Sequence, residues 1–96
     1  MLLERQIQDL RSKRGNFTVV EKERVVQLEG KRLTTVVYAG DKDSSRYYYR
    51  FTLIEFAENP GLIPVVLQIS IPSDWRENKP VLEAITASAR IKPAAP

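Results

Sequence analysis

The chain has 96 residues, of which 43% are apolar and 28% are charged, and its formal net charge at pH 7 is +3. These values are typical of one small globular domain and leave no room for a second domain. The chain contains neither cysteine nor histidine, which excludes disulfides, thiolate sites and Ser–His or Cys–His catalytic triads. No enzymatic activity, cofactor or metal is therefore expected.

The apolar segments are too short for export or membrane insertion. The first residues become polar at Glu4 and Arg5, unlike the apolar centre of a secretory signal. The longest apolar run, Leu62–Leu67, includes a proline and cannot span a bilayer. We expect a soluble, cytoplasmic segment, either complete or part of a longer protein.

The first predicted element is a helix over Leu2–Arg14. Leu3, Ile7 and Leu10 recur at helical spacing and form one apolar stripe. Gly15 is the expected left-handed stop. The stripe predicts a helix that packs one face on the rest of the domain.

From residue 17 onward the apolar residues alternate with a period of two. Phe17 and Val19 share one face, whereas Val26 and Leu28 have the opposite parity. This change predicts a first strand that contains a bulge or an exposed middle. A tight hairpin turn at Gly30 is expected to follow it.

Two further strands are expected, separated by a polar loop. The second strand is Arg32–Ala39, the loop is Gly40–Ser45, and the third strand is Arg46–Ala57. The third strand alternates between two faces. Its apolar face contains Tyr47, Tyr49, Phe51 and Leu53. Ile54 and Phe56 reverse this pattern, which predicts either a bulge or an end covered on both faces.

The fourth strand is expected at Leu62–Ile71, after a type II turn at Asn59–Gly61. Pro64 has no N–H, so the start of the strand should lie at an edge or outside the hydrogen-bonded ladder. One face of this strand should be apolar throughout. Its residues are Ile63, Val65, Leu67, Ile69 and Ile71.

A final helix is predicted over Lys79–Ala89, with Asn78 as its cap and Pro80 near its first position. Its sheet-facing residues should be Val81, Leu82, Ile85 and Ala89. The predicted fold class is α+β: a four-stranded antiparallel meander flanked by an N-terminal and a C-terminal helix. Residues 1–91 form the single domain, and residues 92–96 a disordered tail.

Several segments in succession resemble the PsbP family. They are Gly30-Lys31-Arg32, the aromatic strand Arg46–Phe51, Trp75, and the closing helix Leu82–Ile91. The resemblance covers roughly residues 31–91. It implies a Mog-type fold, in which helices sandwich an antiparallel sheet. The ending Ser88-Ala89-Arg90 matches the family pattern except that the family has an aromatic residue where this chain has Ala89, and the family's N-terminal hairpin is missing.

The resemblance implies a function in binding other proteins. PsbP supports photosystem II, and the Mog branch binds a small GTPase. This chain would be a reduced, non-enzymatic PsbP-like domain, of cyanobacterial type, acting through protein–protein contacts. It could be an accessory or C-terminal module of a larger protein such as a serine/threonine kinase. Because a four-stranded sheet has two open edges, we expect a homodimer through an edge or face, or docking onto another segment of a longer chain.

The candidate partner-binding residues are Arg46, Tyr48, Arg50 and Trp75. The first three share one face of the third strand, which we expect to point to solvent. They form either a recognition strip or the outer face of an ordinary amphipathic strand. Trp75 is either a partner anchor or, as we favour, a cover for the end of the core.

Two other functions use the same residues or fold. Arginines and tyrosines on one strand face could bind single-stranded nucleic acid, although the low net charge makes this unfavourable. A small-ligand-binding domain would require a concave pocket with converging polar groups. The sequence leaves both as alternatives to protein binding.

Overall fold

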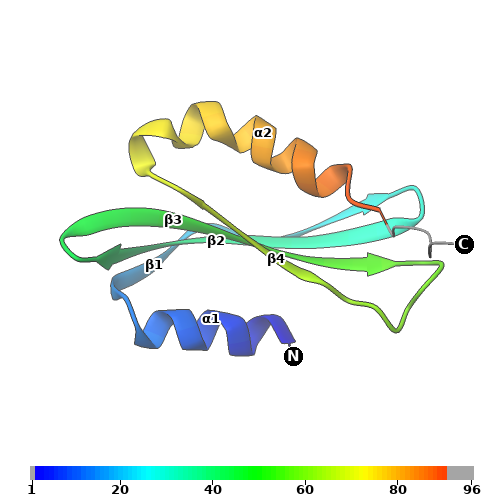
Figure 1. Cartoon of the computed structure of the whole chain (residues 1–96), viewed down its shortest axis with the longest axis horizontal. Coiled ribbons are helices and arrows are strands. Elements are labelled where there is room, and N and C mark those ends of the chain that lie inside the picture. Colours follow the sequence, from blue (N-terminus) through cyan, green and yellow to red (C-terminus); the bar gives the residue numbers. More distant parts are fainter. Residues whose placement is uncertain (1, 91–96) are drawn as a thin grey trace, which may run out of the picture.

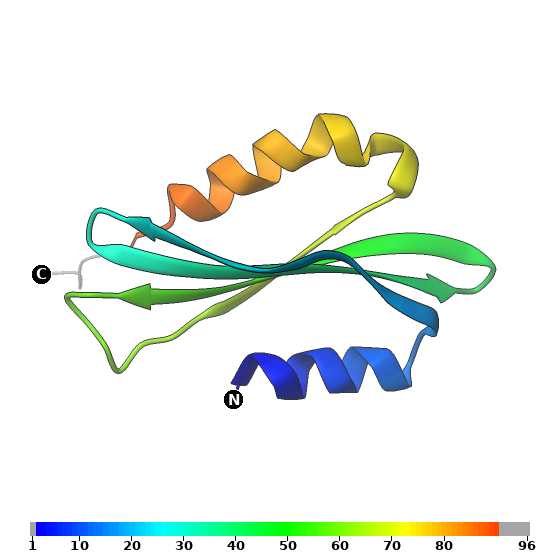
Figure 2. The ribbon, with the colours of Figure 1, turned by 180° about the vertical axis from the view of Figure 1, so that it is seen from behind.

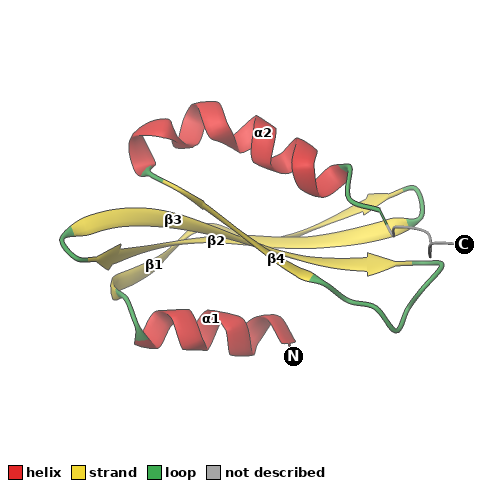
Figure 3. Ribbon diagram, in the orientation of Figure 1, coloured by secondary structure: helices red, strands yellow, loops and turns green. Residues whose placement is uncertain are grey.

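One antiparallel sheet lies between two helices that cover its opposite faces (Figure 1). The computed structural model describes residues 2–90, with strands in the order β1-β2-β3-β4. The elements are α1 (Leu2–Ser12), β1 (Gly15–Leu28), β2 (Lys31–Lys42), β3 (Ser45–Phe56), β4 (Val65–Ser70), the short 3₁₀ helix η1 (Pro72–Asp74) and α2 (Trp75–Ala87). The predicted α+β meander with flanking helices is confirmed (Figure 3). The view from behind shows the same separation of the helices by the sheet (Figure 2).

The α1 face of the sheet holds the larger apolar core. Leu3 and Ile7 of α1 are buried against a group of side chains from β2 and β3, and Leu10 is partly buried there. The group contains Val36, Tyr49, Phe51 and Leu53. Burying side chains of this size contributes about 1.5–3 kcal/mol each. The apolar stripe of the N-terminal segment therefore anchors α1 as its spacing predicts.

The end of α1 differs from the prediction. The helix ends at Ser12, two residues before Arg14, and the left-handed residue is Asn16 (φ 46°), not Gly15. Asparagine accepts this conformation more readily than most residues. Gly15 is instead the first residue of β1.

The α2 face has a second, smaller apolar core at the other end of the sheet. Leu33, Ile54 and Phe56 are buried there, with Val26 and Leu28 of β1 packed against them. β2 and β3 pair without interruption from Lys31↔Phe56 to Lys42↔Ser45. The reversed pattern at Ile54 and Phe56 is therefore an end covered on both faces and not a bulge.

β1 pairs irregularly with β2. Its register with β2 shifts between Gly15 and Thr18, and twice more between Val19 and Arg24. Phe17 packs on the α1 core and Val26 on the α2 core, because strand alternation places residues an odd number of positions apart on opposite faces. The predicted bulge is confirmed.

The predicted loop at Gly40–Ser45 is wrong, because β2 continues to Lys42 and β3 already begins at Ser45. Only Asp43 and Ser44 form the turn, and both have positive φ (51° and 67°). Two consecutive residues of this kind match the twist of the adjoining strands in a two-residue hairpin. The polar composition of residues 40–45 predicts a loop, but pairing between β2 and β3 extends the strands through most of them.

The turn before β4 is also different from the prediction. The Leu62 amide donates to the Asn59 carbonyl at 3.1 Å, which closes a turn. Gly61 does not have positive φ, so the turn is not type II. β4 begins at Val65, three residues later than Leu62, and Pro64 stays outside the strand as expected.

The last helix begins earlier than predicted. α2 starts at Trp75 and contains Pro80 in its interior, while Pro72 occupies the first position of η1. Asn78 does not cap the helix, since its Nδ2 donates to Ser70 Oγ at 3.1 Å. The residues of the predicted tail, 92–96, lie outside the described residues.

The face of α2 that meets the sheet is also different. Val81 and Ile85, predicted to face inward, are 57% and 54% exposed, whereas Thr86 is buried. Leu82 and Ala89 are partly buried, as expected. The helix turns its polar Thr86 inward because an arginine of the sheet lies beneath it.

Candidate functional site

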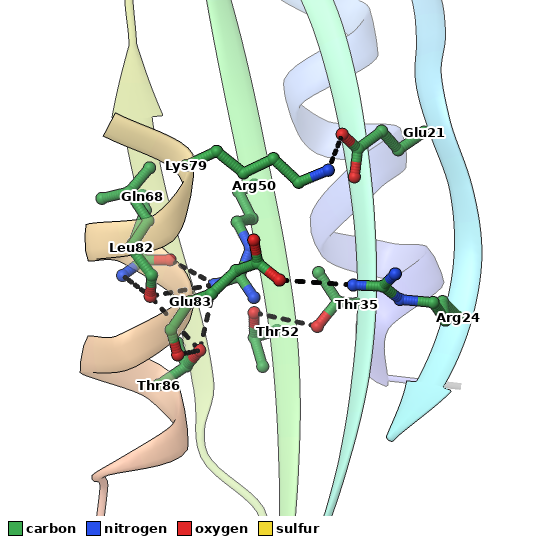
Figure 4. A network of polar contacts seen from close by, with 10 residues as sticks. All are labelled: Glu21, Arg24, Thr35, Arg50, Thr52, Gln68, Lys79, Leu82, Glu83 and Thr86. Atoms are coloured by element: carbon green, nitrogen blue, oxygen red, sulfur yellow. Dashed lines mark hydrogen bonds and ion pairs between the residues drawn. The ribbon is translucent and has the colours of Figure 1, made fainter. Parts of the chain in front are cut away.

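Arg46, Tyr48 and Arg50 share the α2 face of β3, as the alternation predicts. Around Arg50 that face is not directed to solvent, because α2 lies over it (Figure 4), whereas Arg46 remains exposed. Arg50 is only 4% exposed, and Tyr48 is partly buried. Sequence alternation identified the shared face correctly but could not show that a helix covers it.

Arg50 is the centre of a polar network between the sheet and α2. Its Nη1 donates to Gln68 Oε1 at 2.7 Å, to Thr86 Oγ1 at 3.1 Å and to the Leu82 carbonyl at 3.3 Å. Figure 4 shows these acceptors on one side of Arg50, with Thr52 and Thr35 on the other. Three acceptors on one nitrogen join β3, β4 and α2 at a single point.

The charge of Arg50 has no close counterpart. Among the described residues no carboxylate lies within 4.0 Å of its guanidinium. Burial lowers the pKa of Arg50 from its ordinary value, and the more distant Glu83 and Glu21 partly offset this. A buried cation held only by neutral acceptors is unusual, because desolvating a charge is costly without an ion partner.

Further polar contacts fasten α2 along its length. Arg24 of β1 pairs with Glu83 at 3.4 Å, and Lys79 pairs with Glu21 at 2.8 Å. Lys31 Nζ donates to the carbonyls of Ala87 and Ala89 near the end of the helix. Side-chain polar contacts therefore hold α2 where its inner face lacks large apolar residues.

Trp75 and Tyr48 contact each other at the start of α2. Their ring centroids are 5.4 Å apart with planes at 75°, an edge-to-face arrangement. Both side chains are partly buried. This position favours the interpretation of Trp75 as a cover for the end of the sheet.

Arg46 lies nearer the β2–β3 turn and takes no part in the Arg50 network. Its Nη1 pairs with Asp41 at 2.9 Å, and its Nη2 donates to Thr18 Oγ1 at 3.0 Å. Asn16 Nδ2 donates to the other Asp41 oxygen at 2.8 Å. These hydrogen bonds hold the pKa of Asp41 below its ordinary value. The group ties β1, β2 and β3 together at one end of the sheet.

Sequence reasoning missed Gln68 and Thr86 as partners of Arg50. One signal was present: Gln68 interrupts an apolar strand, and β4 pairs it directly with Arg50. Thr86 gave no such signal, because its contact depends on how α2 is rotated. Recognising Gln68 requires the pairing of β3 with β4. Recognising Thr86 requires the packing of α2 on the sheet.

A second candidate surface is the free edge of the sheet at β4. Leu67 and Ile69 pair with Phe51 and Tyr49 of the α1 core but are themselves 44% and 56% exposed. α1 packs on the strands in the middle of the sheet and does not cover them. We call β4 with these two side chains the β4 edge.

The described residues form neither a membrane-spanning helix nor a metal-binding cluster. Neither helix in residues 2–90 is long and apolar enough to cross a membrane. That part of the chain contains no group of three or more acidic residues arranged to hold a metal ion.

Comparison with known proteins establishes the fold alone. No protein-family model and no curated protein matches the chain. A solved structure that is similar is that of PA94 from Pseudomonas aeruginosa, a protein of unknown function described as a candidate regulator. The match has a TM-score of 0.72 and 15% sequence identity, and it covers 97% of this chain. The chain spans only 62% of the length of PA94.

Proposed function

We propose that this domain is non-enzymatic and acts through protein–protein contacts made at the β4 edge. The observation that carries the proposal is a contrast between the two edges of the sheet. β1 is bulged and carries four consecutive charged residues, Glu21 to Arg24. β4 is regular and has no charged residue.

This contrast matters because an unpaired strand edge attracts another strand. Soluble proteins usually protect such edges with charges, bulges or a covering element. β1 has two of these protections and β4 has none, while Leu67 and Ile69 add exposed apolar surface beside it. Addition of a strand would pair the backbone groups of β4 and bury both side chains.

The partner that we propose is a second copy of this chain. Two β4 edges related by a two-fold axis can pair antiparallel, because the same surface then serves on both sides. Leu62 and Ile71, which flank β4 and are also exposed, would lengthen the apolar contact. The product would be one continuous eight-stranded sheet.

Light scattering at micromolar concentration tests this proposal. We expect the wild type to be a dimer and Ile69→Lys to be a monomer. Val25→Lys is the matched control, since Val25 is also 56% exposed but lies on β1. It should remain dimeric. A monomeric wild type whose β4 amides exchange rapidly with solvent would contradict the proposal.

The PsbP-like assignment remains a proposal alongside this one. The antiparallel sheet with helices on both faces supports it. The nucleic-acid alternative loses its basis, because Arg50 is buried and Arg46 is paired with Asp41. No solvent-directed arginine–tyrosine strip is left on β3 for stacking bases and contacting phosphates.

A further inference from the structure

A pocket of about 280 Å³ lies between α2 and the strands β1 and β2, with Arg50 in its lining. Thr35, Val36 and Val37 contribute the wall from β2, and Glu83 contributes from the helix. We call it the α2 pocket. It is separate from the β4 edge, which lies on the other side of β3 in the strand order.

Part of the Arg50 guanidinium is available to this pocket. All three of its hydrogen bonds use Nη1, which leaves the N–H groups of Nε and Nη2 without an acceptor among residues 2–90. In residues 2–90 every side-chain polar atom that is fully removed from solvent has a partner. Nε and Nη2 therefore keep contact with open space. Because Arg50 lines the α2 pocket, this space is the pocket.

The charges around the pocket leave Arg50 without a counter-ion. The lining contains four cations (Lys22, Arg24, Arg50, Lys79) and two carboxylates (Glu21, Glu83). Both carboxylates are already engaged at the rim, Glu83 by Arg24 and Glu21 by Lys79. A further anion would balance the excess positive charge and supply the missing acceptor.

We propose that the α2 pocket binds a small organic acid whose carboxylate pairs with Nε and Nη2 of Arg50. The planar guanidinium presents these donors side by side, which matches the two oxygens of a carboxylate. A bound carboxylate would also offset the cost of desolvating the Arg50 charge, which its neutral acceptors cannot do.

The size and walls of the pocket favour a small organic acid over other anions. At about 30 Å³ per water molecule, its volume equals roughly nine waters. This volume is near the low end for ligand pockets and suits a small organic acid better than a nucleotide or a folded peptide segment. Val37, whose side chain lies on the same face of the sheet as Arg50, would contact an aliphatic stem, which inorganic phosphate lacks.

The wild-type protein provides the first test. Succinate, its neutral analogue succinamide, and inorganic phosphate are each titrated while amide and arginine Nε resonances are followed by NMR. We expect succinate to shift Thr35, Val37 and the Arg50 Nε–H, and succinamide to leave them unchanged. Equal shifts from succinate and succinamide, shifts from phosphate alone, or no shift at these positions would each overturn the proposal.

Variants provide a second test that does not require altering the buried arginine. Glu83→Gln removes a competing negative charge and releases Arg24, so succinate should bind more tightly, by about fivefold. Arg32→Gln is the control, because Arg32 pairs with Glu55 outside the pocket and should not change affinity. Weaker or unchanged binding by Glu83→Gln would contradict the assigned site. The Ile69→Lys variant should bind succinate like the wild type, so the failure of either proposal can be distinguished from the failure of the other.

Discussion

The guanidinium of Arg50 on β3 donates a hydrogen bond to the hydroxyl of Thr86 on α2, at 3.1 Å. Thr86 Oγ1 also contacts the Leu82 carbonyl, at 3.3 Å, so the hydroxyl joins the helix backbone to the sheet. Both residues are almost completely buried. This contact determines which side of α2 faces the sheet, and it explains why two apolar residues of the helix lie outside.

Thr86→Val should destabilise the protein while keeping the shape of the side chain. The substitution removes an acceptor from a charged donor, and we expect the free energy of unfolding to fall by about 1–2 kcal/mol. Urea denaturation measures this. Ser88→Ala is the control, because the exposed Ser88 hydroxyl contacts only the Ile85 carbonyl. A Thr86→Val protein as stable as the wild type would show that the contact contributes nothing.

Tyr48→Leu should loosen the contact at the start of α2. Loss of the edge-to-face pair should cost about 1 kcal/mol beyond the lost area. Trp75 is the only tryptophan, so its fluorescence reports directly on this position. We expect its emission to move to longer wavelength. Tyr47→Leu, on the opposite face of β3, should leave the emission unchanged. Identical emission from the Tyr48→Leu variant and the wild type would argue against the contact.

The Asp41 cluster should contribute stability that depends on pH. Because hydrogen bonds from Asn16 and Arg46 lower its pKa, Asp41 stabilises the fold when ionised. This contribution is complete above its ordinary pKa, about 3.9, and is lost as the pH falls through the lowered value. The stability difference between wild type and Asp41→Asn should therefore be present at pH 7 and shrink in acid.

Urea midpoints measured across this pH range test the prediction. Asp43→Asn is the control, since the Asp43 side chain has no hydrogen bond or ion pair in the described residues. A difference between wild type and Asp41→Asn that is independent of pH would exclude an electrostatic origin.

Gly40→Ala should strain the junction between α1 and the sheet. An added Cβ would lie 2.9 Å from Arg14 Cβ and 3.1 Å from Phe17 Cδ1. Because Cβ of Arg14 is fixed to the backbone, relief requires movement of the chain, and we expect a loss of about 1–3 kcal/mol. In Gly15→Ala the nearest atom would be 3.8 Å away, so thermal unfolding should change little. Equal melting temperatures for the two variants would refute the close approach.

Elements with strong local patterns were predictable from the sequence. The stripe of Leu3 and Ile7 identified α1, and the alternation from Tyr47 to Leu53 identified the apolar face of β3. The hairpin at Asp43 and Ser44 was mistaken for a longer loop, because polar residues can extend a strand when the neighbouring strand pairs with them. The predicted sheet-facing side of α2 was also wrong, because Val81 and Ile85 are exposed and the buried side contains Thr86.

The sequence by itself determined the order of the elements. It also determined that the apolar residues of β1 and β3 switch from one face of the sheet to the other, since periodicity is a local property of the chain. Only the tertiary structure decided that Arg50 is buried and that Leu67 and Ile69 of β4 are left exposed. The physical reason is that burial depends on which element lies over a residue. The polar contacts of Arg50 with Gln68 and Thr86 orient α2, and these residues are 18 and 36 positions away along the chain.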